Sequence, residues 1–155
     1  MSGHKMVVLI CMDGSKHSDY ALKYYRDHIH QQSNRVYVVH CAHYHTEHWQ
    51  TFSMTPADSA VLQSMIDKDI ERISKVVTHL KATIDDLQLT AEIIKVHGNP
   101  GHALVEKSKT IGASMIVVGS RGVGTVRRTF LGSVSDYLVH HAHMPVLVCK
   151  HPQDI

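Results

Sequence analysis

The chain has 155 residues, of which 43% are hydrophobic and 19% charged, so it predicts one globular domain and excludes wholesale disorder. Sixteen Lys and Arg residues against fourteen Asp and Glu leave a net charge of +2, too small for a dedicated electrostatic binder of nucleic acid. The longest apolar run, 6–12, is far shorter than the roughly 20 residues that a membrane-spanning helix needs.

The first predicted strand is the continuous apolar run 7–10, which is typical of a strand buried on both faces. A turn, Asp13-Gly14-Ser15, follows it. Side chains at helical spacing then predict a helix that ends near residue 28: Tyr20, Ala21, Tyr24, Tyr25 and His28. A second strand is predicted over 36–39, followed by a polar loop, 43–55, that contains the only tryptophan.

The next predicted element is a long helix, with Pro56 in its first turn. Its apolar residues recur at steps of three and four: Leu62, Ile66, Ile70, Ile73, Val77, Leu80, Ile84 and Leu87. Such a stripe is typical of a coiled-coil seam or of an amphipathic helix that covers a sheet. We favour the sheet-covering helix, because the stripe ends where the next strand begins.

The second half of the chain repeats the alternation. A third strand is predicted over 91–96, and Asn99-Pro100 then start a short helix that Gly112 ends. A fourth strand is predicted over 115–118, and a glycine-rich loop leads from it into a helix with four residues spaced along one face: Val134, Tyr137, Leu138 and His141. A fifth strand is predicted over 145–149, and Pro145 at its start indicates the edge of a sheet.

Strands that alternate with helices predict parallel βαβ units with right-handed crossovers. The fold class is therefore α/β, a single doubly wound domain with a five-stranded parallel sheet and helices on both faces. We expect one domain over residues 1–155, with its core at about 5–150. Open sheets of this kind bind ligands at the carboxyl ends of their strands, where the strand order reverses.

The loop after the fourth strand is the strongest candidate for a ligand site. It contains no Walker A sequence, and Arg127 stands where the Rossmann fingerprint requires a third glycine. Glycines at 119 and 122 would allow close approach of a ligand and positive φ angles. The start of a helix at Gly132-Ser133 would offer free N–H groups to an anion, and Arg121, Arg127 and Arg128 would add positive charge along the connecting loop. Alternatively, these glycines only permit turns and Ser133 only caps its helix.

This loop resembles the nucleotide motif G-x2-G-x9-G-[ST] of the universal stress protein (UspA-like) family, with Gly119, Gly122, Gly132 and Ser133 at the motif positions. Other stretches are similar to the family's first strand and loop (8–18), to the loop before its third helix (97–100) and to its closing strand (144–148). The resemblance extends from about residue 5 to residue 150. It implies a flavodoxin-like or adenine-nucleotide α-hydrolase-like sheet, and it favours the ATP-binding branch of the family.

The resemblance also implies a site and a partner. Asp13 matches the residue at the nucleoside end, Cys41 the position beside adenine, and Val118 and Gly119 the wall beside the ribose. The matching phosphate cradle is Gly122, Gly132, Ser133 and Val134. The implied ligand is ATP, together with Mg²⁺, and the implied assembly is a homodimer joined through the C-terminal strand.

Whether the chain is an enzyme stays open at this point. Phosphoryl hydrolysis needs a base or water-orienting residue and a lysine or metal clamp, and no set of nucleophile, base and orienting residue is evident. We therefore expect a stress-response switch with slow or no ATP turnover and no catalytic residues. A true ATP hydrolase or transferase, and a nucleotide-free dimeric interaction module, remain the alternatives.

Three cysteines, Cys11, Cys41 and Cys149, lie in or beside β-branched runs and are predicted to be buried, reduced thiols. Lys5 leads directly into strand-like residues without a secretory signal, and Ser2 replaces the glycine that myristoylation requires. We therefore expect a soluble, cytoplasmic protein with neither membrane nor nucleic-acid partners.

The fifteen histidines are the most unusual feature of the composition. Two groups could offer imidazoles to a transition metal, namely His43, His45 and His48, and His140, His141 and His143. Neither group has the spacing of a closed zinc site, so solvated side chains are the simpler interpretation and no metal site is assigned. Acidification below about pH 6.5 would make this surface more positive.

Overall fold

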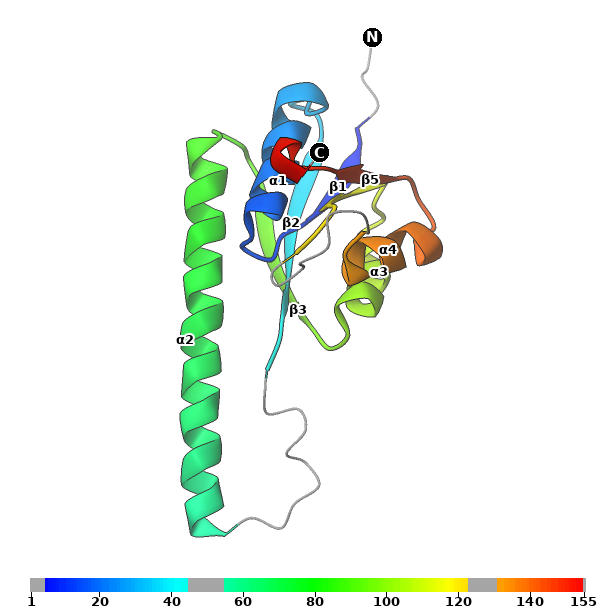
Figure 1. Cartoon of the computed structure of the whole chain (residues 1–155). Helices are drawn as coiled ribbons and strands as arrows, with labels where there is room; N and C mark the ends of the chain where they lie inside the picture. Colours follow the sequence, from blue (N-terminus) through cyan, green and yellow to red (C-terminus); the bar gives the residue numbers. More distant parts are fainter. Residues whose placement is uncertain (1–4, 45–54, 123–130, 155) are drawn as a thin grey trace.

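The computed structural model describes residues 5–44, 55–122 and 131–154 (Figure 1). Strands and helices alternate along the chain as the sequence predicts. The elements in chain order are β1 (Val7–Cys11), α1 (Lys16–His28), β2 (Arg35–Ala42), α2 (Pro56–Asp86), β3 (Glu92–His97), α3 (Pro100–Thr110), β4 (Met115–Gly119), α4 (Ser133–His141), β5 (Val146–Cys149) and a final 3₁₀ turn (Pro152–Asp154).

All five strands form one parallel sheet in the order β3-β2-β1-β4-β5. This confirms the predicted α/β fold with a five-stranded parallel sheet, and β5 lies at an edge as Pro145 indicated. The chain builds outward from β1 through β2 to β3, and then returns to place β4 on the other side of β1. The strand order therefore reverses between β1 and β4, where an open α/β sheet forms its ligand crevice.

Helices cover both faces of this sheet (Figure 1). On one face, α1 and α2 bury side chains such as Leu22, Tyr25 and Leu80 against Val8 and Val38 of the sheet. On the other face, α3 and α4 pack a second cluster, in which Leu104, Val105 and Leu138 meet alternate residues of the same strands. Successive side chains of a strand point to opposite faces of the sheet. Alternate residues of each strand therefore pack against α1 and α2 on one face and against α3 and α4 on the other.

Helix α2 divides into two parts that the sequence pattern does not distinguish. Ile73, Leu80 and Ile84 of its stripe are buried, whereas Ile70 is 54% exposed. Figure 1 shows the N-terminal part of α2 running past the ends of the strands. The sheet-covering interpretation therefore applies to the C-terminal part of the helix, because only that part lies over the sheet.

Two polar contacts hold α2 beside the rest of the domain. His79 Nε2 lies 2.8 Å from a carboxylate oxygen of Asp19 on α1. Arg72 lies 3.1 Å from Asp69 and donates a hydrogen bond to the carbonyl of His43, just beyond β2. These contacts bring α2 close to the carboxyl ends of β1 and β2, the end of the sheet where the ligand crevice is expected.

The three cysteines are free thiols, but they are not equally buried. Burial, and secondarily the nearby charge of Asp13, raises the pKa of Cys11, and burial raises the pKa of Cys149 to about 11. Both thiols therefore stay protonated at neutral pH. Cys41 is only half-buried, so the prediction of a buried thiol is wrong there. Its side chain lies at the end of β2, near the rim of the sheet rather than within the core.

Within the described ranges, no helix combines the length and the apolar character needed to cross a bilayer.

Candidate functional site

The first wall of the site is the turn after β1, at the point where the strand order reverses. The carboxylate of Asp13 accepts a hydrogen bond from the backbone N–H of Ser15 at 2.9 Å. Ser15 in turn caps α1, accepting from the N–H of Ser18 at 3.2 Å. Gly14 has a φ of +82°, a conformation that favours glycine. The turn therefore fixes Asp13 between the end of β1 and the start of α1.

The second wall is the end of β4, where Gly119 lies against α1. A Cβ atom at Gly119 would lie 2.9 Å from the backbone carbonyl carbon and oxygen of His17, closer than packing allows. The expectation of positive φ at Gly119 and Gly122 is wrong, because the described glycines with positive φ are Gly14, Gly98 and Gly112. At Gly119 and Gly122 the absent side chain is needed for close approach instead.

Gly122 and Gly132 bring the two walls together. A Cβ atom on Gly122 would overlap the Oδ2 atom of Asp13, so the glycine backbone lies directly against this carboxylate. A Cβ atom on Gly132 would lie 3.3 Å from the Cα of Arg121 and 3.6 Å from the backbone nitrogen of Gly122. Gly122 thus lies against Asp13, which is more than a hundred positions earlier in the sequence, and close to Gly132.

The start of α4 is held at this point by β4. The carbonyl of Ser120 accepts hydrogen bonds from the N–H of Gly132 at 2.7 Å and from the hydroxyl of Ser135 at 3.1 Å. The N–H of Ser120 donates to Cys149 and so extends the pairing of β4 with β5. Because both ends of the intervening segment are fixed in this way, the position of the α4 N-terminus relative to the sheet is set by backbone contacts.

Helix α4 differs from the other helices in how it begins. Ser15, Thr55 and Asn99 cap α1, α2 and α3 with side-chain oxygens. The N-cap of α4 is Gly132, and no side chain of the described residues caps this helix. Ser133 follows as the first helical residue and is exposed, so the alternative in which it serves as the cap is wrong. The first-turn N–H groups of α4 therefore receive no side-chain acceptor at this edge of the sheet.

The other predicted site residues lie around this centre in different ways. Cys41 is at the end of β2, with its thiol 3.6 Å from the carbonyl of Gly98. The side chain of Val118 is buried in the core under α3 and α4, so it can offer only its backbone to a ligand. Val134 is half-buried against the same core. The site residues accordingly come from β1, β2, β4 and α4.

Two further residues near the carboxyl ends of the strands were not among the predicted binding residues. Arg121 is only 8% exposed although it is charged, and it lies between the glycines at 119 and 122. His40 of β2 is 5% exposed and contacts the carbonyl of Met12, the residue before Asp13. The sequence already indicated the positive charge of Arg121 in the glycine loop, whereas the burial of His40 follows only from the tertiary packing around β2.

The histidine groups of the sequence do not assemble in the part of the chain that the structure describes. Among those residues, no three His, Cys, Asp or Glu side chains are placed to hold a metal ion. His45 and His48 lie outside the described residues, as do Arg127, Arg128 and the only tryptophan. His141 instead stacks on Tyr137 at a ring distance of 3.9 Å and contacts its carbonyl, which is a contact within α4.

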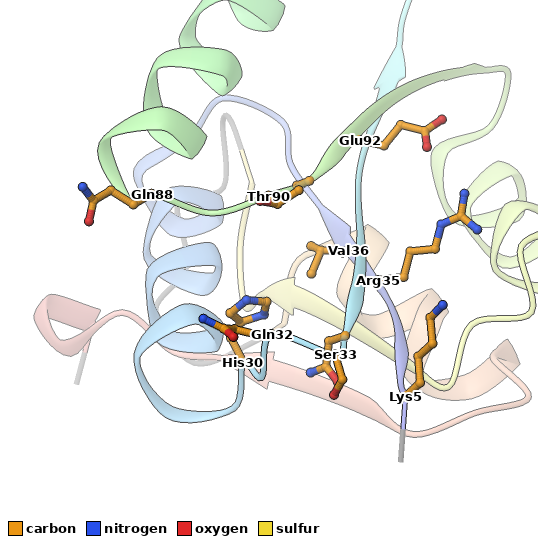
Figure 2. A pocket seen from close by; sticks show the side chains of 11 residues that line it. Lys5, His30, Gln32, Ser33, Arg35, Val36, Gln88, Thr90 and Glu92 are labelled. Atoms are coloured by element: carbon orange, nitrogen blue, oxygen red, sulfur yellow. The ribbon is translucent and has the colours of Figure 1, made fainter. Parts of the chain in front are cut away.

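A separate pocket of about 690 Å³ lies at the opposite edge of the sheet, by the amino ends of β2 and β3 (Figure 2). Lys5, Arg35 and Glu92 place charges of both signs around it. At its base, the Tyr25 hydroxyl accepts from the Asn34 amide and contacts His30 Nδ1, each at 3.1 Å. We do not place the ligand site here, because the amino ends of parallel strands lie away from the crevice where the strand order reverses.

His30 predicts how acid affects the stability of the fold. Burial lowers the pKa of His30 below its ordinary value of 6.5, so the unfolded chain binds a proton more readily than the folded one. The stability that this neutral histidine contributes is present above about pH 6.5 and is lost as the pH falls through the lower folded value. We expect urea midpoints to fall between pH 7 and pH 5, and a His30→Asn variant to show a shallower fall. Parallel profiles for the two proteins would contradict this assignment.

A comparison of the sequence with protein-family models matches residues 6–150 to the universal stress protein family. Among curated proteins, the chain is 34% identical over 76 residues to the universal stress protein YxiE of Bacillus subtilis, covering 49% of this chain and 51% of YxiE. It is also 30% identical over 99 residues to an uncharacterised protein of Schizosaccharomyces pombe, covering 61% of this chain and 16% of that protein. The chain thus spans about half the length of the first relative and a small part of the second.

Solved structures resemble the chain over nearly its whole length. The universal stress protein UspA from Lactobacillus plantarum superimposes with a TM-score of 0.71 at 18% identity, covering 95% of this chain and 99% of that one. A universal stress protein in complex with cAMP gives 0.65 at 21% identity, covering 95% and 98%. A family protein from Arabidopsis thaliana with AMP bound gives 0.66 at 17% identity, covering 96% and 94%. At these identities the likeness is one of fold.

Proposed function

The chain belongs to the universal stress protein family, and on that premise we propose that it is an ATP-binding switch whose nucleotide lies across the carboxyl ends of β1, β2 and β4. The observation that carries the proposal is the meeting of Asp13, Gly122 and Gly132 beside a helix that no side chain caps. The proposed binding residues are Asp13, Cys41, Val118, Gly119, Gly122, Gly132, Ser133 and Val134.

The phosphate end of the proposed site rests on the first turn of α4. Uncapped N–H groups at a helix N-terminus attract anions, because the amides and the helix dipole both present positive charge there. Gly122 and Gly132 keep side chains away from this turn, and the exposed Ser133 can donate its hydroxyl to a phosphate oxygen. The backbone of Arg121 lies next to both glycines, and this buried residue brings a positive charge to the loop.

The nucleoside end rests on the neighbouring strands. Cys41 and Gly98 lie at the carboxyl ends of β2 and β3, and β2 pairs with β1, which leads into the turn that holds Asp13. Two proteins of the same fold carry AMP and cAMP, which supports an adenine nucleotide as the class of ligand. ATP is the member of that class that we propose, because the uncapped helix offers a place for phosphates beyond the first.

Mg²⁺ fits the proposed site through Asp13. Magnesium prefers carboxylate and phosphate oxygens, and it is commonly held by one or two carboxylates together with the phosphates of a nucleotide. Asp13 lies directly against Gly122, so its carboxylate is next to the proposed phosphate cradle. The metal would offset the repulsion between this carboxylate and the phosphates, and we therefore expect ATP to bind more weakly in the presence of EDTA.

The direct test of the proposal is isothermal titration of Mg-ATP into the purified, nucleotide-free protein. We expect a single site with a dissociation constant in the micromolar range, which corresponds to a binding free energy of about −8 kcal/mol. A Gly132→Val variant should lose this binding, because its Cβ would crowd Arg121 and Ser120 and its branches would enter the cradle.

The variant must first be shown to fold, by an unchanged far-UV circular dichroism spectrum. AMP and GTP serve as competing ligands that measure the contribution of the phosphates and of the base. If the folded wild type binds none of these nucleotides, the interaction-module alternative takes the place of this proposal.

Slow turnover is a second expectation of the switch. Rapid hydrolysis requires a positioned base and a charge clamp on the transferred phosphoryl group. Among the residues that the structure describes, Asp13 and Arg121 are the charged residues that we assign to the proposed cradle. We therefore expect ATP hydrolysis below about one per second, where typical enzymes work at about 1–1000 per second. Faster, saturable hydrolysis that an Asp13→Ala variant abolishes would indicate the ATP hydrolase instead.

The remaining parts of the proposal concern assembly and location. β5 lies at the edge of the sheet and is four residues long, so its outer side is available to pair with the β5 of a second copy. A homodimer through this strand, in the cytoplasm, is what we propose. Its molar mass in solution, measured by light scattering with and without ATP, tests the dimer.

A further inference from the structure

His40 makes one hydrogen bond with its ring, and that bond determines the state of the other ring nitrogen. The Nδ1 atom lies 2.9 Å from the carbonyl oxygen of Met12. A carbonyl oxygen can only accept, so Nδ1 carries a proton and donates it. In the neutral ring, Nε2 then has a lone pair and no proton. Nε2 is buried and has no hydrogen-bond partner among the described residues, an arrangement that calls for an explanation.

The Met12 peptide lies where β1 separates from β2. The last paired residue of β1 is Cys11, opposite Val39, and the N–H of Met12 still donates to the carbonyl of Val39 at 3.0 Å. Beyond this point the chain turns toward Asp13, and the carbonyl of Met12 takes its hydrogen bond from the side chain of His40. His40 therefore extends the contact between β1 and β2 by one residue after the regular backbone pairing ends.

The Met12 carbonyl group that His40 contacts is bonded directly to the backbone nitrogen of Asp13, a residue of the proposed site. The carbonyl of Met12 and the nitrogen of Asp13 belong to the same planar peptide group, so fixing the carbonyl fixes the direction in which Asp13 leaves the strand. Asp13 then has to meet both the N–H of Ser15 and the backbone of Gly122. A rotation of the Met12 peptide would move the carboxylate away from both.

We propose that His40 is the positioning residue of the nucleotide site, holding the Met12–Asp13 peptide so that the Asp13 carboxylate faces the phosphate loop. The inference rests on the proposed function, because it assigns His40 a role in binding at that same site. His40 does not touch the ligand in this account. It acts through the Met12 carbonyl, and committing the ring proton to that carbonyl leaves Nε2 as an acceptor.

A matched pair of substitutions separates positioning from packing. Asparagine can place its amide nitrogen where Nδ1 lies, and glutamine can place its amide nitrogen where Nε2 lies. His40→Asn therefore keeps a donor for the Met12 carbonyl but leaves more empty volume, whereas His40→Gln fills more of the volume but moves the donor. A packing role favours the glutamine variant, and a positioning role favours the asparagine variant.

The experiment measures Mg-ATP affinity for the wild type and both variants by isothermal titration, after folding is checked by circular dichroism. We expect His40→Asn to bind within about threefold of the wild type and His40→Gln to bind about fivefold or more weakly, as the loss of one hydrogen bond of about 1 kcal/mol predicts. Long-range ¹H–¹⁵N spectra of the nucleotide-free wild type should show the Nδ1-protonated tautomer of His40. Backbone resonances of Asp13 and Gly14 should move in the glutamine variant alone.

The outcomes keep the two proposals apart. The positioning role is overturned if the wild type binds Mg-ATP and the two variants bind it with equal affinity. It is also overturned if the asparagine variant binds more weakly than the glutamine variant. In both cases the proposed nucleotide site stands. The Nε2-protonated tautomer in the wild type overturns the positioning role as well. A wild type that binds no nucleotide overturns the proposed function, and with it the purpose assigned to His40.

Discussion

Replacing Gly122 with alanine is expected to weaken Mg-ATP binding by at least about tenfold, or about 1.4 kcal/mol, without unfolding the protein. The added Cβ would overlap Oδ2 of Asp13, so the phosphate loop or the carboxylate has to move. The carboxylate also accepts from the N–H of Ser15, which opposes its displacement. Gly122 has no positive φ, so alanine causes no backbone strain there and the effect falls on the site.

A matched control for this substitution is Gly112→Ala, at the end of α3. Gly112 has a φ of +65°, and nothing lies within 4 Å of the position a Cβ would take. Alanine there should reduce the free energy of unfolding by about 1 kcal/mol through backbone strain and leave ATP affinity unchanged. Equal ATP affinity in the wild type and the Gly122 variant, or an equal loss in both variants, would refute the proposed role of the loop.

Replacing Leu80 with alanine is expected to produce the largest loss of stability, about 2–5 kcal/mol in the free energy of unfolding. Leu80 is fully buried where α2 covers the sheet, in the cluster that includes Leu22 and Tyr25 of α1. Removal of its side chain leaves a cavity that fixed neighbours on the sheet cannot fill. Urea denaturation followed by circular dichroism measures the change.

Ile70→Ala is the matched control within the same helix. Ile70 belongs to the same apolar stripe but is 54% exposed, so its truncation should change the free energy of unfolding by less than about 1 kcal/mol. Comparable losses at both positions would mean that the N-terminal part of α2 is covered in solution, and would contradict the division of the helix into two parts.

The division of α2 also shows a limit of pattern analysis. The stripe from Leu62 to Leu87 repeats with the same spacing along the whole helix, and spacing alone is what the sequence reports. Whether a given position is buried depends on how far the sheet extends beneath it. The strands are four to eight residues long and α2 has 31, so the helix outruns the surface that it covers.

The glycines show another limit of the same kind. The sequence predicts that Gly119 and Gly122 are needed, and it attributes the need to close approach of a ligand and to positive φ. In the structure the need comes from contacts with His17 and Asp13, which are distant in the chain. Positive φ occurs instead at Gly14, Gly98 and Gly112. A local sequence pattern cannot distinguish the two reasons, because close approach is a property of two segments rather than one.

By itself, the sequence determined the alternation of strands and helices, the parallel sheet, the edge position of β5 and the start of α4 at Gly132. These features depend on local properties: apolar runs, helix caps, proline and glycine. Only the tertiary structure decided the strand order 3-2-1-4-5, the contact of Asp13 with Gly122, the half-burial of Cys41 and the burial of His40 and Arg121. These depend on which distant segments pack together, and that is fixed by burial across the whole domain rather than by any stretch of the chain.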